Sequence, residues 1–198
     1  MKVGDPCGSL AVALGANLGD PGATLVAVRP LLQALLLPGG EQAAAGRGGG
    51  RCRWSPLFRT DPVGGPAAQP PYLNAAVVVD RIGAGASPDP WRLLAQLQHL
   101  EAASGRQRQL RWGPRSLDLD LLWCGELRIR AEGLELPHPR TLERTFVLAP
   151  LAAIEPSLVP PGQRRGPLRD AASLLAELLP LRPEAPPQRL PPRSGWPE

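Results

Sequence analysis

The alternation of short apolar runs with helical segments is the feature of this sequence that most limits its fold. Residues 9–15, SLAVALG, form an apolar run suited to a buried strand, and the segment after it can be a helix with Asp20 as its N-cap and Pro21 in its first turn. Residues 51–60, RCRWSPLFRT, alternate loosely and predict a strand, in which Pro56 favours a sheet edge. This part of the chain therefore predicts strand, helix and strand.

The same alternation continues in the next part of the chain. Residues 72–82, YLNAAVVVDRI, are rich in β-branched side chains and predict a strand. A helix follows, with Ser87 as its cap and Gly105 at its end, and residues 116–123, SLDLDLLW, predict the last core strand. The order is βαββαβ, so we expect an α+β fold of the ferredoxin-like type. In that fold two helices cover one face of an antiparallel sheet, and we expect the other face to be free for function.

The remaining segments extend this unit. Residues 124–179 predict C-terminal αβ additions: a hairpin around CGEL, a loop and two helices. A chain of 198 residues suits one domain, which we place at residues 1–179. The Pro-rich residues 180–198 predict a disordered tail, and the Gly-rich residues 38–50 a flexible surface loop.

Composition bounds the compartment and the partners. Three cysteines without a CxxC pair argue against a disulfide framework and a structural zinc site, and they fit a reducing cytosol. No apolar stretch approaches the ~18 residues of a membrane span, and no signal peptide is recognised, so we expect a cytoplasmic protein without a membrane partner. The net charge is +4, with Lys2 as the single lysine, so the placement of arginines is more informative than their number.

Two aspartates in the last predicted strand indicate a metal site. Side chains alternate along a strand, so Asp118 and Asp120 share one face, about 7 Å apart at Cα, while the opposite face, toward the core, carries Leu117, Leu119, Leu121 and Trp123. Two carboxylates this close repel each other unless cations lie between them, and a pair of Mg²⁺ ions fits this spacing. The alternative is an ordinary amphipathic strand with its charged face in water.

Arginines directly ahead of this strand favour the metal interpretation. Arg106, Arg108, Arg111 and Arg115 lie in a loop that is poor in apolar residues. Guanidinium groups match phosphate oxygens, so an acid pair beside a basic loop suits a nucleoside triphosphate with Mg²⁺. The segment GANLGD lacks the GK[ST] ending of a Walker loop, so side chains and metal must hold the phosphates.

The stretch RWGPRSLDLDLL resembles the signature of the 6-hydroxymethyl-7,8-dihydropterin pyrophosphokinase family. Five further blocks agree in order: ALGANLGD, FRTDPVG, PYLNAAV, LEAASGRQR and LPHPRTLERTFVLAPLAAIEP, so that the resemblance spans roughly residues 9 to 160. It implies an ATP-dependent diphosphokinase of folate biosynthesis, which transfers pyrophosphate from ATP to the hydroxymethyl group of the pterin and releases AMP. It also implies a monomer that binds no nucleic acid, and association with other folate enzymes stays open.

The resemblance implies roles for individual residues of this chain. It implies a catalytic set of Arg106, Arg115, Asp118 and Asp120, in which the two aspartates ligate two Mg²⁺ ions together with ATP. It implies ATP contacts by Gln98, Arg108, Arg115, His138 and Arg144, with Glu101 beside the active site. It implies pterin contacts by Thr60, Pro62, Val63, Gly64, Tyr72, Asn74, Asp118 and Phe146, the ring stacking between Tyr72 and Phe146. Trp112 and Arg111 would lie on a loop that closes over the site.

Several of these residues have plainer interpretations. Tyr72 could be an aromatic residue at a strand start, Phe146 a core residue of its helix, and His138 a solvated loop side chain. Asn74 could bond only a neighbouring loop. The arginine loop is one residue shorter than in common relatives, which leaves the role of Arg111 open.

An RNA-binding domain is the rival from another class, because such domains share the βαββαβ order and are often basic. The third predicted strand carries a single aromatic residue instead of their stacking pattern, and the fourth carries two aspartates that would repel a phosphate backbone.

Overall fold

One antiparallel sheet organises the molecule. The computed structural model describes residues 8–37, 50–66, 68–80, 88–105, 113–163 and 166–197. Within these residues the strand order is β5-β1-β4-β3-β8, with β2 also paired to β4, and every pairing is antiparallel. The strands are β1 (Leu10–Ala16), β2 (Arg51–Trp54), β3 (Phe58–Thr60), β4 (Tyr72–Asp80), β5 (Asp118–Cys124) and β8 (Gln188–Arg189). The expected βαββαβ order and ferredoxin-like fold are confirmed, with the strand expected over 51–60 divided at residues 55–57.

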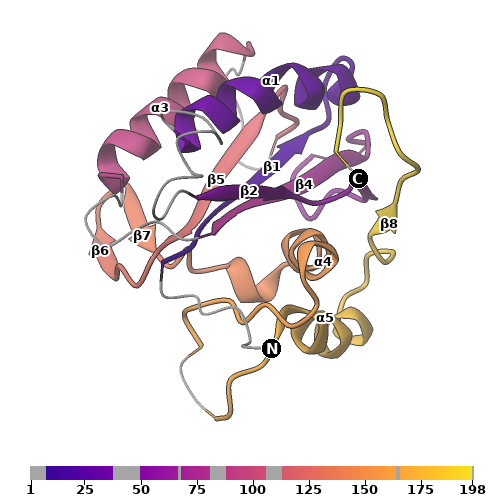
Figure 1. Cartoon of the computed structure of the whole chain (residues 1–198). Coiled ribbons are helices and arrows are strands. Elements are labelled where there is room, and N and C mark those ends of the chain that lie inside the picture. Colours follow the sequence, from indigo (N-terminus) through magenta and orange to yellow (C-terminus); the bar gives the residue numbers. More distant parts are fainter. Residues whose placement is uncertain are drawn as a thin grey trace.

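Helices cover both faces of the sheet. Helices α1 (Pro21–Leu36) and α3 (Pro90–Ala103) lie on one face, and α4 (Thr145–Ile154) and α5 (Ala171–Leu178) lie on the other side (Figure 1). Short 3-10 helices η1 (Thr141–Glu143) and η2 (Leu179–Leu181) and the hairpin of β6 (Ile129–Ala131) and β7 (Leu134–Leu136) complete the additions. The sequence predicted that the second face of the sheet would be free. This prediction is wrong for part of that face, because α4 packs on it. No helix in the described ranges has the length and apolar character that a membrane crossing would need.

Side-chain capping sets where the two helices on the first face begin. The Asp20 carboxylate accepts the backbone N–H of Ala23 at 2.9 Å, as expected for the N-cap of α1. Helix α3 begins with Pro90, and its cap is Asp89, which accepts the N–H of Trp91 at 2.9 Å. The expected cap Ser87 lies outside the described residues. In the sequence SPDP, Ser87 and Asp89 each precede a proline, and the second of them, Asp89, is the N-cap of the helix.

Strand alternation divides the core into two layers. Leu10, Val12 and Leu14 of β1 face α1 and α3, where they join the larger core cluster. Ala11 faces the other way and packs with Ala76 of β4 and with the apolar side of α4. These small side chains let α4 lie close to the sheet, since interiors pack without voids.

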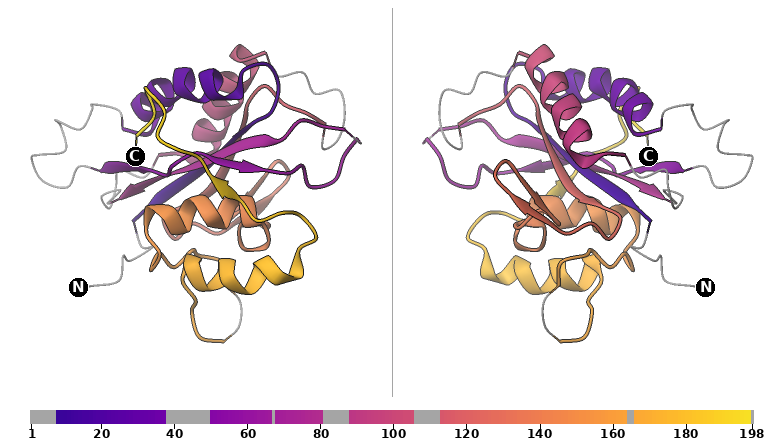
Figure 2. Two further views of the ribbon diagram at one scale, coloured as in Figure 1. Left: turned by 90° about the vertical axis from the view of Figure 1, so that its right-hand side faces the viewer. Right: turned by 90° about the vertical axis from the view of Figure 1, so that its left-hand side faces the viewer.

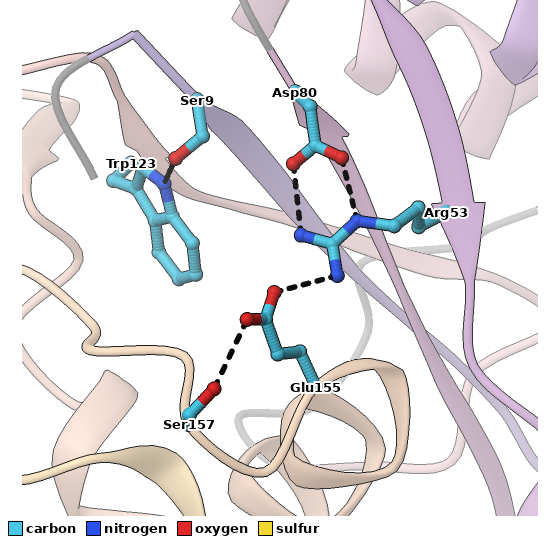
Figure 3. A network of polar contacts seen from close by, with 6 residues as sticks. All are labelled: Ser9, Arg53, Asp80, Trp123, Glu155 and Ser157. Carbon is cyan, nitrogen blue, oxygen red and sulfur yellow. Dashed lines mark hydrogen bonds and ion pairs between the residues drawn. The ribbon is translucent and has the colours of Figure 1, made fainter. Parts of the chain in front are cut away.

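The Trp123 side chain points to the opposite face of the sheet from the one that the sequence predicted, because the pairing of β1 with β5 is irregular. The pairing of β1 with β5 is irregular between Ala11 and Val12, so alternation breaks at the end of β5. Leu122 and Trp123 both join the cluster beneath α4, whereas Trp123 was expected to face the same core as Leu119. The Trp123 indole Nε1–H donates to Ser9 Oγ at 3.0 Å, which satisfies its polar atom inside the core (Figure 3).

An ion-pair network fixes the far end of α4 to the sheet. The Arg53 guanidinium on β2 donates to both carboxylate oxygens of Asp80 on β4, at 2.6 and 2.8 Å. Its third nitrogen donates to Glu155 at 2.9 Å, and Ser157 donates to the other oxygen of Glu155 at 3.0 Å (Figure 3). Glu155 directly follows α4, so two neighbouring strands hold the end of this helix.

The Pro-rich C-terminal segment is ordered where the structure describes it. Strand β8 pairs with β3, and Trp196 is 7% exposed within the larger core cluster. The expectation of a disordered tail at 180–198 is therefore wrong for residues 180–197, because an aromatic anchor and backbone pairing offset the entropy cost of ordering it. The Gly-rich segment, apart from Gly50, lies outside the described residues.

Candidate active site

A cavity opens on the part of the second sheet face that α4 leaves uncovered. In register across three strands, Gly15 of β1 lies between Asn74 of β4 and Asp118 of β5, and Ala13 pairs with Asp120. The period of two places both aspartates on this face, as the sequence predicts. The cavity encloses about 110 Å³. Its lining comprises Ala13, Leu14, Gly15, Thr60, Asp61, Pro62, Val63, Gly64, Gln69, Tyr72, Asn74, Arg115, Asp118, Asp120, Arg144 and Phe146.

The floor of the cavity requires a glycine. A Cβ atom on Gly15 would lie 3.0 Å from Asn74 Oδ1, 3.8 Å from the Tyr72 ring and 4.0 Å from Asp118 Cβ. Any side chain here would therefore fill the space between the polar groups. The sequence pattern did not single out Gly15, because a glycine in a buried strand is equally compatible with simple packing.

All eight residues expected to contact a pterin line this one cavity: Thr60, Pro62, Val63, Gly64, Tyr72, Asn74, Asp118 and Phe146. They come from the end of β3 and its following loop, the start of β4, the start of β5 and the start of α4. The Asn74 Nδ2 group donates to Thr60 Oγ1 at 2.7 Å, and both side chains are buried. Asn74 thus bonds the neighbouring β3, as its plainer interpretation suggested, and it also faces the cavity.

Each aspartate of the acid pair meets one arginine. Arg115 Nη1 lies 2.5 Å from Asp118 Oδ1, and Arg144 Nη1 donates to Asp120 Oδ2 at 3.1 Å. The Arg144 guanidinium also lies over the Phe146 ring, 5.3 Å from its centroid. Burial lowers the pKa of Arg115, but the charge and hydrogen bond of Asp118 outweigh that effect and hold the pKa above its ordinary value. The two arginines therefore lie side by side with the two aspartates, in reach of a ligand that carries both anionic oxygens and metal.

His138 lies next to the cavity without lining it. Its backbone N–H donates to the Leu122 carbonyl at 2.7 Å, and its Nδ1 accepts the N–H of Arg140 at 3.2 Å. Burial lowers the pKa of His138; the Asp120 carboxylate opposes this effect, and Arg144 and Arg140 add to it. The ring is therefore neutral at pH 7, with its Nε2–H free to act as a donor. A neighbouring hollow between the β6–β7 hairpin and residues 161–162 includes His138 in its wall.

Of the two other expected ATP contacts, Gln98 and Arg108, the structure describes Gln98. Gln98 is exposed on α3 and does not line the cavity. Arg106, Arg108, Arg111 and Trp112 lie outside the described residues, so their roles stay predictions. Glu101 lies beneath β5, where its buried carboxylate accepts the N–H of Leu119 at 2.8 Å, between the two aspartates.

Sequence reasoning missed Asn17, a buried side chain that joins three loops beside the cavity. Its Oδ1 accepts the Arg115 N–H at 2.7 Å, its Nδ2 donates to the Pro70 carbonyl at 3.0 Å, and its own N–H donates to the Arg115 carbonyl at 2.9 Å. Nearby, the Tyr72 hydroxyl donates to the Gly113 carbonyl at 3.2 Å. The available signal was a polar residue directly after a buried strand, inside the block ALGANLGD.

The donor set suits a metal that takes most of its ligands from a substrate. The described residues contain no group of three or more His, Cys, Asp and Glu side chains able to hold a metal ion. Mg²⁺ commonly uses only one or two carboxylates, with water and phosphate oxygens as the remaining ligands. Asp118 and Asp120 on one wall of the cavity match that requirement. The arrangement can hold a flat ring between Tyr72 and Phe146 and a metal-bound polyphosphate beside the acid pair.

Comparisons with known proteins agree with this geometry. The family model described as 7,8-dihydro-6-hydroxymethylpterin-pyrophosphokinase matches residues 11–156. The chain is 40% identical to the 2-amino-4-hydroxy-6-hydroxymethyldihydropteridine pyrophosphokinase of Pseudomonas aeruginosa, over 79% of this chain and 86% of the relative. It is also 40% identical to the Bacillus subtilis protein of that name, over 72% and 75% of the two chains.

Longer proteins share the same unit. The folate synthesis bifunctional protein of Arabidopsis thaliana is 39% identical over 75% of this chain, which corresponds to 24% of that protein. Among solved structures, a Plasmodium falciparum HPPK-DHPS triple mutant superposes with a TM-score of 0.56 at 13% identity. This match covers 87% of the present chain and 43% of the other, and it supports the fold alone.

Proposed function

The chain belongs to the 7,8-dihydro-6-hydroxymethylpterin-pyrophosphokinase family, and from this premise we propose how its cavity performs the reaction. The enzyme is a diphosphokinase of folate biosynthesis that transfers a pyrophosphoryl group from ATP to the hydroxymethyl oxygen of 6-hydroxymethyl-7,8-dihydropterin, with AMP as the leaving group. One observation supports the proposal most strongly. A single cavity combines an acid pair, two arginines, and aromatic side chains from β4 and α4.

The pterin occupies the half of the cavity between Tyr72 and Phe146. A flat heterocycle stacks on aromatic faces, and the Asn74 amide with the loop at residues 60–64 offers groups for its hydrogen-bonding edge. The Asn74–Thr60 hydrogen bond orients this amide before the ligand arrives. The ring is therefore recognised by preformed groups, which lowers the entropy cost of binding.

The triphosphate occupies the other half, beside Asp118 and Asp120. The two carboxylates would hold Mg²⁺, with two ions expected, and bound Mg²⁺ would neutralise phosphate charge and polarise the phosphorus. Arg115, Arg144 and the neutral His138 are placed to donate to phosphate oxygens, and we keep Gln98, Arg106 and Arg108 as further proposed contacts. Trp112 and Arg111 remain proposed loop-closing residues.

Positioning and charge stabilisation explain the transfer without a strong base. The hydroxymethyl oxygen attacks the β-phosphorus in line, a new O–P bond forms, the bond to the AMP oxygen breaks, and the hydroxyl proton is released to solvent. The arginines stabilise the charge that develops on the phosphate oxygens, which is where phosphoryl-type transfer needs assistance. Because Tyr72 stands on β4 and the acid pair on β5, with β1 between these strands, the two reactants meet on one face of the same sheet.

Nucleotide products give the decisive test of this function. We expect the purified protein to form AMP from ATP only when Mg²⁺ and the pterin are both present, in a one-to-one ratio with the pyrophosphorylated pterin. Asp120→Asn should lower turnover at least about 100-fold while the protein stays folded, because it removes an electrostatic contact of the transition state. Glu132→Gln, on an exposed carboxylate of the hairpin, is the control. ADP formation, or a fully active Asp120→Asn variant, would contradict the proposal.

The resemblance also leads us to propose a monomer in the cytoplasm that binds no nucleic acid. Two cysteines, Cys52 and Cys124, are buried and form no disulfide, which is consistent with a reducing compartment. Light scattering after size exclusion tests the oligomeric state.

A further inference from the structure

The end of the chain crosses the edge of the sheet and finishes against α1. We name residues 188–197 the C-terminal strap. From α5 the chain runs past β8 along the sheet edge and then reaches the helix on the opposite side of the sheet (Figure 2). The family model ends at residue 156, so it does not include this segment.

The strap pairs with the strand that leads into the pterin half of the cavity. Arg189 lies opposite Phe58 and Gln188 opposite Arg59 in the β8–β3 pairing. The Leu190 N–H then donates to the Leu57 carbonyl at 2.8 Å. Strand β3 has three residues and ends at Thr60, which already lines the cavity. An edge strand this short has little stability of its own, so the second partner matters for its position.

A buried tryptophan anchors the strap to the segment between β2 and β3. The Trp196 indole Nε1–H donates to the Ser55 carbonyl at 2.8 Å. Its ring meets the Trp54 ring edge to face, with centroids 5.5 Å apart and planes at 79°. Ser55 is itself tied to β4, because its Oγ accepts the Ala76 N–H at 2.9 Å. The strap thus contacts the chain from Trp54 to Arg59, directly before the cavity residue Thr60.

Helix α1 receives the last residues of the strap in a close fit. Arg29 Nε donates to the Gly195 carbonyl at 3.2 Å, and Arg193 Nη2 lies 3.7 Å from Asp20 Oδ1. Gly195 has φ +80°, and a Cβ atom there would lie 2.8 Å from Val26 Cγ1. Only glycine satisfies both the backbone angle and the approach to Val26.

From these contacts we propose that the C-terminal strap is a positioning element of the reaction: it fixes β3 and so sets the loop at residues 60–64 for the pterin. This inference rests on the proposed function. The strap contacts β3, the β2–β3 segment and α1, as described above, whereas the acid pair stands on β5 and its arginine partner Arg144 directly precedes α4. Loosening the strap should therefore weaken pterin binding and leave ATP binding nearly unchanged.

Gly195→Ala tests this role with a matched control. The added Cβ meets Val26 and strains the backbone, which should lift the anchor without deleting a side chain. Gly166→Ala adds the same group at the same φ of +80°, with no atom within 4 Å of the new Cβ. We expect the KM for the pterin to rise about five- to tenfold in Gly195→Ala, with the KM for ATP and kcat within about twofold of wild type. Gly166→Ala should leave the three constants unchanged.

A second pair of variants covers the case in which Gly195→Ala leaves the strap in place. Trp196→Ala removes the anchor, and Trp91→Ala, at an exposed tryptophan of α3, is its control. Trypsin cleavage at Arg189 and Arg193 reports directly whether the strap has lifted. Faster cleavage with a selective loss of pterin affinity supports the proposal.

Three results overturn the strap's role: a lifted strap with an unchanged pterin KM, an equal rise in both KM values, or a strap that resists both substitutions. A wild-type protein that forms no pterin-dependent AMP would instead remove the proposed function.

Discussion

At the scale of single residues, Asn17 shows how one buried amide can organise a site that it does not line. It bonds both backbone groups of Arg115 and the carbonyl of Pro70, so the loop before β5 and the loop before β4 are held to the end of β1. Arg115 in turn faces Asp118. The position of the arginine therefore depends on an amide 98 residues earlier in the chain.

We predict that Asn17→Ala lowers kcat about tenfold or more and destabilises the protein by about 1 kcal/mol, because the part-buried Arg115 N–H and the Pro70 carbonyl lose their side-chain partner. Asn17→Asp keeps an acceptor for the Arg115 N–H but places a carboxylate oxygen against the Pro70 carbonyl. This variant should lose comparable stability and retain more activity. Steady-state kinetics and urea unfolding on both variants measure the two effects. Losses of activity that simply follow the losses of stability would contradict a positioning role.

The sequence could predict the cavity residues that follow a local pattern and not those that act across the chain. Asp118 and Asp120 follow from strand alternation, and the family blocks identify Tyr72 and Phe146, which do line the cavity. Gly15 and Asn17 acquire their roles from distant partners in β4, β5 and the loops. Spacing along a chain carries no information about such partners, so these two residues needed the structure.

At the scale of elements, α4 is held at both ends by charges. Arg144, directly before the helix, pairs with Asp120 at the cavity, and Glu155, directly after it, pairs with Arg53. Arg53 is shared with Asp80, so the far end of α4 is tied to both β2 and β4 (Figure 3). The position of Phe146 against the sheet is therefore supported by one ion pair at the cavity and by one at the far end of the helix.

We predict that Glu155→Gln lowers the free energy of unfolding by about 1 kcal/mol while kcat stays within about threefold of wild type, because the pair is partly buried and lies at the end of α4 away from Phe146. Glu177→Gln is the matched control. Its partner Arg169 and Glu177 itself are about half exposed, so the loss should stay below about 0.5 kcal/mol. Denaturant unfolding measures the free energy of unfolding of the two variants, which can be compared if their m-values are equal. Equal stabilities would show that the Arg53 network does not fasten α4.

Element order was predictable because capping and apolar runs are local signals. The βαββαβ series, the cap at Asp20 and the helices after residue 140 all follow from such signals. Three features depend on tertiary packing instead. They are the packing of α4 on the second face, the irregular pairing that turns Trp123 toward α4, and the ordered conformation of the strap. In the strap, a proline-rich composition that favours disorder is overridden by one buried tryptophan and an available strand edge.

At the scale of the whole molecule, one face of the sheet has to accommodate two substrates of different chemistry, a flat ring and a charged triphosphate. In the proposed mode of binding, the pterin half presents Tyr72, Phe146 and the loop at residues 60–64, whereas the phosphate half brings two carboxylates and two guanidinium groups together. Without a cation, the carboxylates repel a triphosphate at the distance where the arginines attract it. If the proposed function holds, we expect tight ATP binding to need the metal; without ligands, Arg115 pairs with Asp118 and Arg144 with Asp120.

Metal removal should consequently abolish the stabilisation of the protein by ATP. With ATP and Mg²⁺ at about 100 times the dissociation constant, binding adds about 2.7 kcal/mol, which for a domain of this size raises Tm by roughly 5 to 10 °C. We expect this rise to disappear when EDTA is added, and Asp120→Asn to show little rise even with Mg²⁺. Mg²⁺ alone should produce a small change, because two carboxylates supply few of its ligands. Thermal unfolding with ATP, Mg²⁺ and EDTA in turn measures each case. An equal rise with EDTA present would mean that arginines alone hold the phosphates, and that Asp118 and Asp120 serve the fold instead of a metal.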